Sequence, residues 1–236
     1  VSWQMIYSSF PSPNRVSYLL ASKHEAERVY AILQNDQHHT LLFRSNNMGK
    51  NWDNLKANLP DETINTIVED PVNEQVLYLG TENGLYVSFD MGEKWHPFHQ
   101  NLPRTSVSAI AINPETNELY IGTRGNGFFM ANIGSLRELR AAVQNQLFYP
   151  LKETYSIAYS PKWGNAPSPW QAPEEPVLYI ESFASKANSN ITINIIKDDI
   201  TLAKFSYQTK EGFNFIPFDL TFIENGRVEY EKKLLT

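Results

Sequence analysis

Apolar residues in this chain recur in short runs separated by turn residues, and the runs follow one another in the same order three times. Each run alternates apolar and polar residues, or is continuously apolar, over the length of a β-strand. The first runs lie at 16–22, 64–70 and 107–113, the second at 28–34, 76–81 and 118–123, and the third at 40–45, 84–89 and 127–132. The pattern predicts three similar groups of antiparallel strands.

A tryptophan phrase accompanies these groups and predicts a fourth strand in each. A Trp is followed by apolar residues three and seven places later and by a Pro at the eighth place, starting at Trp3, Trp52 and Trp95. The spacing fits one small sheet per repeat, as in a β-propeller, and the Pro is expected to end the strand. We therefore predict about three four-stranded blades over 1–134, with each Trp wedged between neighbouring blades. Because a propeller needs roughly four to eight blades to close, we expect the sequence to be part of a longer protein.

The pattern changes after residue 134. Ser135 and Glu138 have the spacing of a capping box, and an apolar face follows, which predicts a short helix over 136–145. A segment rich in Pro, with Trp163 and Trp170, completes a predicted helix and connecting strap over 135–175. Strand patterns resume after it, and 191–197 alternates cleanly, which predicts a small antiparallel β-sandwich over 176–236, short enough that a terminal strand is expected to be missing. The predicted fold class is all-β.

Composition narrows the possible functions. With 26 acidic and 20 basic residues the net charge is −6, which argues against a nucleic-acid partner. The absence of Cys excludes disulfides, thiolate metal sites and thiol nucleophiles. No apolar run approaches the ~20 residues that cross a bilayer, so no membrane-spanning segment is expected. Phosphate-binding and dinucleotide motifs are missing as well, and we expect neither a cofactor nor a metal.

A motif of the form S-x-D-x-G-x-x-W occupies the turn between the predicted third and fourth strands, once with Asn replacing Asp. Its members are Ser45, Asn47, Gly49 and Trp52, and Ser88, Asp90, Gly92 and Trp95. In such a hairpin turn the Ser and Asp side chains bond turn amides, Gly takes a positive φ, and Trp fills the apolar gap beside the neighbouring strand. We therefore interpret these eight residues as structural.

The motif resembles the Asp box of bacterial neuraminidase repeats, found in sialidases, sortilin-type receptors, xyloglucanases and bacterial surface propellers. The segments LYLGTENGLYVSFDMGEKW and ELYIGTRGNGFF are similar to the last blades of sortilin-like propeller proteins of Bacteroidota-type bacteria. EGFNFIPFDL resembles the penultimate strand of an immunoglobulin-like domain that follows such blades. The resemblance implies C-terminal blades followed by an immunoglobulin-like domain, in an exported, extracellular or cell-surface protein. It implies no single activity, because such folds host many functions.

Candidate contact residues lie on the loops at the end of the blades opposite the boxes. These loops carry Arg15, His38, His39, Asp61, Glu62, Glu82, Asn83, Arg104, Arg124 and Asn126. The residues predicted to contact a ligand are Asp61, Glu82, Arg104, Arg124 and Asn126. The adjacent His38 and His39 have no evident third ligand, so a metal site is not expected there.

Three functions remain open. The first is a non-catalytic binding or scaffold module at a bacterial cell surface that contacts protein or glycan. The second is part of a sialidase- or xyloglucanase-like glycoside hydrolase whose catalytic carboxylates lie in other blades, because Asp61, Glu62 and Glu82 are expected to be solvated. The third is a subunit of an outer-membrane protein assembly, attached through the strap. No catalytic residue is predicted within this sequence.

Overall fold

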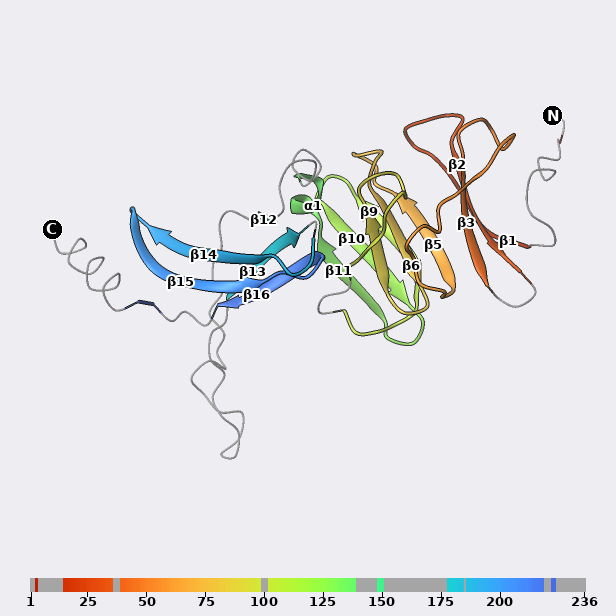
Figure 1. Ribbon diagram of the computed structural model, residues 1–236. Helices are drawn as coiled ribbons and strands as arrows, with labels where there is room; N and C mark the ends of the chain where they lie inside the picture. The colour runs from red at the N-terminus through yellow and green to blue at the C-terminus, as the bar shows by residue number, and fades with distance from the viewer. Residues whose placement is uncertain are drawn as a thin grey trace. The chain divides into compact units, whose positions relative to one another are not determined.

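The computed structural model describes residues 3, 15–35, 39–98, 102–138, 148–150, 178–184, 186–218 and 222–223 (Figure 1). The chain divides into two compact units, Val1–Arg140 and Ala141–Thr236. Almost every described element is a β-strand, and the described part of helix α1 covers only Gly134–Glu138. The prediction of an all-β chain with propeller blades is confirmed.

The first unit contains three antiparallel sheets, which we call blades 1, 2 and 3. Blade 1 has the order β1 (Arg15–Ala21), β2 (Val29–Gln34), β3 (Thr40–Ser45) and β4 (Asp53–Asn54). Blade 2 has the order β5 (Ile64–Glu69), β6 (Leu77–Thr81), β7 (Leu85–Ser88) and β8 (His96–Pro97). Blade 3 has three described strands, β9 (Val107–Asn113), β10 (Glu118–Thr123) and β11 (Phe128–Asn132). Each is a meander in which neighbours along the chain pair.

The three blades match one another residue by residue. Val16 pairs with Leu33 in blade 1, Ile64 with Thr81 in blade 2, and Val107 with Thr123 in blade 3. A register shift lies next to each of these pairs. Such an irregularity bends the strand and increases its twist locally. The repeat in the sequence is therefore also a repeat in the backbone, and positions can be compared between blades.

The apolar core of the first unit lies between blades rather than on one side of them. It includes Tyr30, Ile32 and Leu42 of blade 1 together with Ile64 and Ile67 of blade 2. Strand β2 is buried continuously over its central residues because both of its faces are covered. Stacking of one sheet on the next thus provides the burial that a single sheet could not.

The fourth strands are much shorter than the tryptophan phrase predicts. Strand β4 ends at Asn54, well before Pro60. The Asn54 side chain accepts a hydrogen bond from the Lys56 amide at 2.8 Å, and Ala57 takes a positive φ of 36°. These local bonds turn the chain away from the sheet before the Pro is reached.

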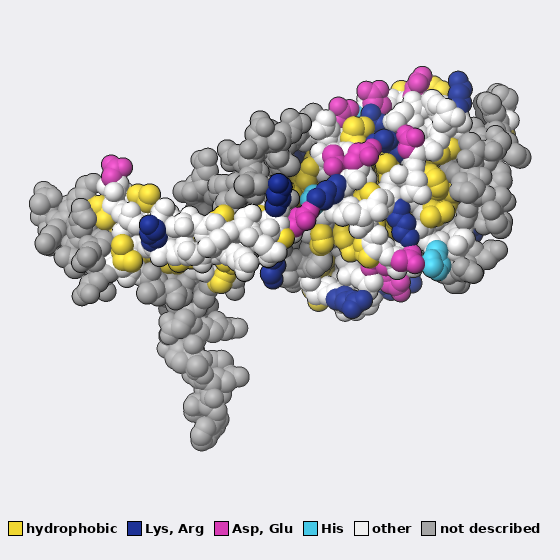
Figure 2. Space-filling model, viewed as in Figure 1, with side chains coloured by type: hydrophobic (Ala, Val, Ile, Leu, Met, Phe, Trp, Pro, Cys, Tyr) yellow, Lys and Arg dark blue, Asp and Glu magenta, His cyan; other side chains and the backbone are white. Residues whose placement is uncertain are grey.

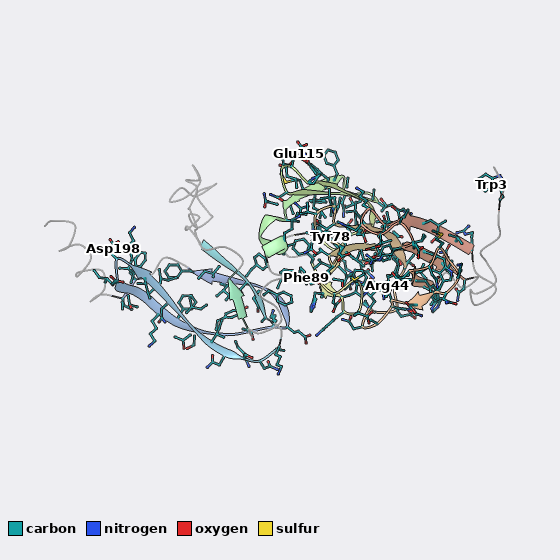
Figure 3. The ribbon with its side chains drawn as sticks, turned by 90° about the horizontal axis from the view of Figure 1, so that it is seen from above. Trp3, Arg44, Tyr78, Phe89, Glu115 and Asp198 are labelled. Carbon is teal, nitrogen blue, oxygen red and sulfur yellow. The ribbon has the colours of Figure 1, made fainter. Side chains whose placement is uncertain are left out.

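The three tryptophans do not share one environment, so the prediction of equivalent wedges is wrong for Trp3. Trp95 is 1% exposed, and its Nε1 donates a hydrogen bond to the Leu55 carbonyl of blade 1 at 2.9 Å. Trp3 is 97% exposed and stands apart from the sheets, whereas the labelled Tyr78 lies among them (Figure 3). The Trp3 ring therefore lacks the contact between two blades that buries Trp95.

Helix α1 begins at Gly134, ahead of the predicted start at residue 136. The Asn132 side chain accepts a hydrogen bond from the Gly134 amide at 2.9 Å. The Ile133 carbonyl accepts hydrogen bonds from the amides of Leu136 and Arg137. The backbone of Ser135 therefore lies inside the first turn of the helix. The predicted continuation to 145 and most of the predicted strap, including Trp163 and Trp170, lie outside the described residues.

The second unit contains two sheets that share an apolar core. One sheet has the order β12 (Phe148–Pro150), β13 (Leu178–Ala184) and β16 (Gly212–Phe218), and the other pairs β14 (Asn190–Lys197) with β15 (Ile200–Gln208). Ile180, Ala203, Ile216 and Phe218 form the buried centre, and the rings of Phe205 and Phe218 stack at 5.8 Å. Side chains of β14 alternate between partly buried and exposed, as expected for a strand with one covered face. An immunoglobulin-like topology for this unit stays a prediction.

Candidate functional site

Antiparallel pairing sorts the loops of the first unit between two ends of the blades. The box end carries the loops after β1, β3, β5 and β7, including 46–52 and 89–95. The opposite end carries the loops at 35–39, 55–63, 82–84, 98–106 and 124–127. All five predicted contact residues belong to loops of this opposite end.

Three side chains from successive loops form a chain of contacts at the opposite end. Asn83 donates a hydrogen bond from Nδ2 to the Glu62 carboxylate. The Arg104 Nε donates in turn to Asn83 Oδ1 at 3.0 Å. Arg104 is exposed, whereas Glu62 and Asn83 are half-buried. The loops after β4, β6 and β8 are thereby joined by side chains, with the arginine at the exposed end.

Asp61 lies next to Glu62 in the sequence, and its carboxyl group is held in the ionised form. Lys56 Nζ bonds its Oδ1 at 2.7 Å, and His39 Nδ1 lies 3.3 Å from its Oδ2. The hydrogen bond and charge of Lys56, and then the charge of His39, hold the pKa of Asp61 below its ordinary value. The side chain of Asp61 is 62% exposed, so it presents a negative charge to solvent.

The remaining predicted contact residues are positioned by backbone bonds. The Glu82 amide donates to the Thr63 carbonyl at 2.9 Å, and the Arg124 amide donates to the Ser106 carbonyl at 2.8 Å. Arg124 and Asn126 are exposed on the turn after β10, where Gly125 and Gly127 take positive φ values. In the described part of the chain, no hydrogen bond joins these two side chains to those of Asp61, Glu82 or Arg104.

The two turns at the box end have the same internal hydrogen bonds. The Ser45 hydroxyl accepts from the Gly49 amide, and the Ser88 hydroxyl accepts from the Gly92 amide, both at 2.8 Å. Each hydroxyl also donates to the Oδ1 atom of the residue two places later, Asn47 or Asp90.

Asn47 and Asp90 use that same oxygen to accept a second bond, from the amides of Asn51 and Lys94 at 2.8 and 2.9 Å. Only an acceptor oxygen is needed at this position, so an amide serves as well as a carboxylate. The bonds occupy the Oδ1 atom of Asp90 within its own turn.

Asn58 is not among the predicted residues, although it fixes the backbone of Trp95. Its Oδ1 accepts from the Trp95 amide at 2.8 Å, and its Nδ2 donates to the Trp95 carbonyl at 2.7 Å. The side chain thus replaces a strand neighbour between blades 1 and 2. A signal was present in the sequence, because Asn58 and Asn101 each follow a box tryptophan by the same number of residues.

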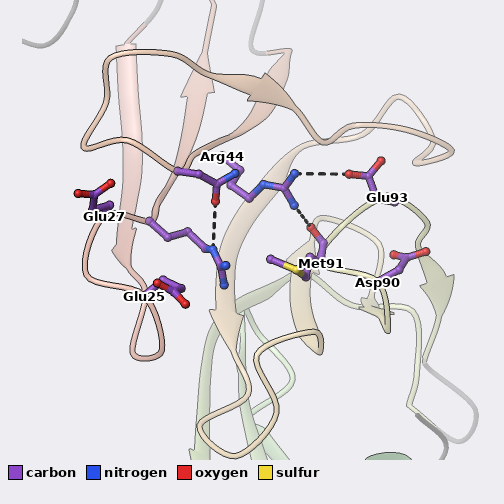
Figure 4. Close-up of a pocket in the computed structure, with 8 residues that line it drawn as sticks. Glu25, Glu27, Arg44, Asp90, Met91 and Glu93 are labelled. Atoms are coloured by element: carbon purple, nitrogen blue, oxygen red, sulfur yellow. Dashed lines mark hydrogen bonds and ion pairs between the residues drawn. The ribbon is translucent and has the colours of Figure 1, made fainter. Parts of the chain in front are cut away.

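A pocket of about 430 Å³ opens at the box end, between blades 1 and 2 (Figure 4). It is lined by Glu25, Glu27, Arg28, Arg44, Asn46, Asp90, Met91 and Glu93. Arg44 donates to the Met91 carbonyl at 2.9 Å and lies 3.4 Å from the Glu93 carboxylate. Arg28 also connects the two blades, because its Nη1 lies 3.5 Å from the Glu69 carboxylate of blade 2, while its Nε bonds Asn46 within blade 1 at 3.1 Å.

Metal-ligand clusters and membrane-spanning helices are both absent from the described residues. Among them, no group of three or more His, Asp or Glu side chains is arranged to hold a metal ion. No helix in the described ranges is long and apolar enough to cross a membrane. Acidic and basic side chains lie interspersed over the first unit on the face shown in Figure 2.

The first unit consists of repeated antiparallel meanders that stack through buried strands and share the same Ser-Gly hairpin turn in blades 1 and 2. This arrangement defines it as part of a β-propeller protein. Residues 40–202 match the Sortilin-Vps10 family, described as "Sortilin, neurotensin receptor 3". The chain belongs to this family, which confirms the resemblance to sortilin-like propeller proteins. No curated protein matches the chain.

Similar solved structures include three glycoside hydrolase family 74 (GH74) proteins. The GH74 enzyme of Niastella koreensis is 16% identical, with 50% of this chain and 21% of that chain covered and a TM-score of 0.41. The GH74 xyloglucanase of Xanthomonas campestris is 16% identical, with 58% of this chain and 25% of that chain covered and a TM-score of 0.40. An ancestral GH74 enzyme is 18% identical, with 64% of this chain and 17% of that chain covered and a TM-score of 0.42. The match spans a quarter or less of each of these chains.

Proposed function

We propose that this chain is a non-catalytic binding module of an exported, cell-surface bacterial protein, which contacts protein or glycan through the loops opposite the boxes. The observation that carries the proposal is the chain of contacts from Glu62 through Asn83 to Arg104. An immunoglobulin-like second unit would serve as a spacer. A place in an outer-membrane assembly is a further possibility, and co-purification with a membrane complex would support it.

Preorganisation is the physical reason to expect binding at Arg104. The bond to Asn83 fixes the Nε side of the guanidinium, so less conformational entropy is lost when a ligand binds the other nitrogens. Asp61 adds an ionised acceptor on the neighbouring loop. A surface with donors and acceptors side by side suits hydroxyl groups of a glycan or the polar backbone of a peptide.

The state of Asp61 argues against its use as the general acid of a glycoside hydrolase. Glycoside hydrolysis requires one carboxyl that is protonated near the working pH. The pKa of Asp61 is shifted in the opposite direction, because Lys56 and His39 stabilise its charged form.

Binding to immobilised ligands tests the proposal. The whole chain would be applied to immobilised xyloglucan oligosaccharides, to 3′-sialyllactose and to a random peptide array. For any ligand bound, Arg104→Ala should weaken binding at least tenfold, because a charge-assisted hydrogen bond contributes about 1.5–3 kcal/mol. Lys50→Ala, an exposed change at the box end, is the control and should bind as the unmodified chain does.

Two results would count against the proposed function. Equal binding by Arg104→Ala and the unmodified chain would show that the loops opposite the boxes are not the contact surface. Release of reducing sugar from xyloglucan, or of sialic acid from 3′-sialyllactose, by the purified chain would favour the glycoside hydrolase alternative.

A further inference from the structure

We infer that Asn126 is a site of spontaneous deamidation, at which the side-chain amide becomes a carboxylate through a cyclic imide. The site is the Asn126-Gly127 pair in the turn between β10 and β11. Among the described residues there is one other Asn-Gly pair, Asn83-Gly84, in the corresponding turn of blade 2. A third pair, Asn225-Gly226, lies outside the described residues. The two described pairs differ in whether the asparagine side chain is held, and this difference sets their reactivity.

The reaction needs only the residues of the pair and water. The Gly127 amide nitrogen attacks Cγ of Asn126, an N–C bond forms, the bond from Cγ to the side-chain nitrogen breaks, and ammonia leaves with the amide proton. Water then opens the imide ring at either of its carbonyl groups. Opening at the side-chain carbonyl gives aspartate, and opening at the main-chain carbonyl gives isoaspartate. Glycine favours ring closure because it has no Cβ to obstruct the approach.

Both reacting groups of the Asn126-Gly127 pair are free in the structure. Asn126 is exposed, and among the described residues no hydrogen bond is made by its side chain or by the Gly127 amide. A Cβ built at Gly127 or at Gly125 would meet no described atom within 4 Å. The ring therefore has room to form, and water can reach it.

Asn83 is part of the same dipeptide, but both atoms of its side-chain amide are held. Its Nδ2 donates to the Glu62 carboxylate, and its Oδ1 accepts from Arg104 Nε at 3.0 Å. Asn83 is also half-buried. Turning Cγ toward the Gly84 nitrogen would break both hydrogen bonds, so these contacts protect Asn83 from the reaction.

One reason for the difference is the length of the turn. In blade 2 the Thr81 amide bonds the Gly84 carbonyl at 2.9 Å, whereas in blade 3 the Thr123 amide bonds the Gly127 carbonyl at 2.9 Å. The turn in blade 3 is thus one residue longer. Its additional glycine, Gly125, takes a positive φ of 99°.

A second reason is that the carboxylate that holds Asn83 has no counterpart in blade 3. Thr63 and Ser106 are equivalent, because the carbonyl of each accepts a hydrogen bond from the first residue after the second strand of its blade. The residues that precede them are Glu62 and Thr105. Blade 3 therefore has a short hydroxyl side chain where blade 2 has a carboxylate.

Deamidation would change the charge of the loops opposite the boxes. Asn126 follows Arg124 in the same turn, and the carboxylate formed from it is ionised at neutral pH. Isoaspartate would in addition lengthen the main chain of the turn. The reaction itself does not depend on the proposed binding function, because it involves only this turn and water.

Mass spectrometry of the whole chain, incubated in mildly alkaline buffer and then digested with trypsin, tests this inference. Asn126 and Asn83 fall in different tryptic peptides, because Lys94, Arg104 and Arg124 lie between them. Each converted site gains about 1 Da, the difference between an amide and a carboxylic acid, and fragment masses locate the gain. Asn126 should convert at least about tenfold faster than Asn83, because two hydrogen bonds hold Asn83. Asn126→Gln should remove the fast conversion, because the longer side chain closes a less favourable ring.

The same incubation in guanidinium chloride separates the effect of the structure from that of the sequence. Both asparagines are released in the unfolded chain, so Asn83 should convert at about the rate of Asn126. In the folded chain, Glu62→Ala combined with Arg104→Ala should accelerate the conversion of Asn83 and leave that of Asn126 unchanged, with folding checked by circular dichroism. Equal rates at the two sites in the folded chain, or a tenfold difference that persists in denaturant, would overturn the inference.

Discussion

Trp95 illustrates at the residue scale how one side chain joins two blades. Its ring is buried, its Nε1 bonds the Leu55 carbonyl, and Asn58 bonds its backbone on both sides. Gly92 lies beneath the ring, and a Cβ at that position would come within 2.9 Å of Leu55 Cδ1. Glycine at this position therefore serves the turn through its positive φ of 93°, and the packing around the tryptophan through its lack of a Cβ.

Replacing Trp95 with Ala is expected to lower the free energy of unfolding of the first unit by about 3–5 kcal/mol, because it leaves a cavity between blades and removes a buried hydrogen bond. Chemical denaturation would measure the change. Trp3→Ala is the matched control, and should change stability by less than about 0.5 kcal/mol because Trp3 is exposed. A loss below about 1 kcal/mol for Trp95→Ala would contradict its role between the blades.

The lowered pKa of the Asp61 carboxyl predicts a pH dependence of the folding stability. Because its folded-state pKa is lowered, Asp61 stabilises the fold at pH values above its unfolded-state pKa of about 4. That contribution is lost as the pH falls through the lower folded-state pKa. Lys56→Met should raise the pKa of Asp61 toward its ordinary value, as a carboxyl NMR titration would report. Lys50→Met should leave that titration unchanged, and an unshifted midpoint in Lys56→Met would refute the assigned cause.

At the scale of elements, helix α1 is fastened to two turns of the first unit. Arg137 Nε bonds the buried Asp70 carboxylate at 3.0 Å, and Arg137 Nη1 bonds Asn117. Asp70 also accepts hydrogen bonds from the amides of Val72 and Asn73 in its own turn. One arginine therefore connects the turn after β5, the turn after β9 and the helix.

Arg137→Met should destabilise the first unit by about 3–5 kcal/mol, because it leaves the Asp70 carboxylate buried without its cationic partner. Combining it with Asp70→Asn should cost less than the sum of the two single changes. A double-mutant cycle measured by thermal or chemical unfolding gives this coupling. Strict additivity of the two changes would mean that the ion pair does not carry the effect.

The elements that the sequence misplaced are those decided by local side-chain bonds. Strands with two covered faces, such as β2 and β6, follow from apolar runs and lie within a residue of their predicted bounds. Strand β4 and the start of α1 differ because Asn54 and Asn132 bond nearby amides and redirect the chain. Asparagine at such positions competes with regular structure, and hydrophobic patterning does not detect this competition.

At the scale of the whole molecule, the two compact units have separate cores. We expect two unfolding transitions in calorimetry. Ile216→Ala, in the core of the second unit, should lower the midpoint of one transition, and Trp95→Ala should lower that of the other. Each change should leave the remaining transition within about a degree of its original midpoint, since it would remove about 2–5 kcal/mol from one unit alone. A single transition shifted by both changes would contradict separate cores.

The sequence by itself determined the repeat, the strand order within each blade and the end of the blades at which each loop lies. These features follow from the periods of apolar residues and from turn chemistry, which act over a few positions. Only the tertiary structure decided that Glu62, Asn83 and Arg104 touch, that Asn58 fixes Trp95, and that Phe128 is exposed while its counterparts Leu42 and Leu85 are buried. Those outcomes depend on which blade stacks on which, and contacts between residues far apart in the sequence leave no local periodic signal.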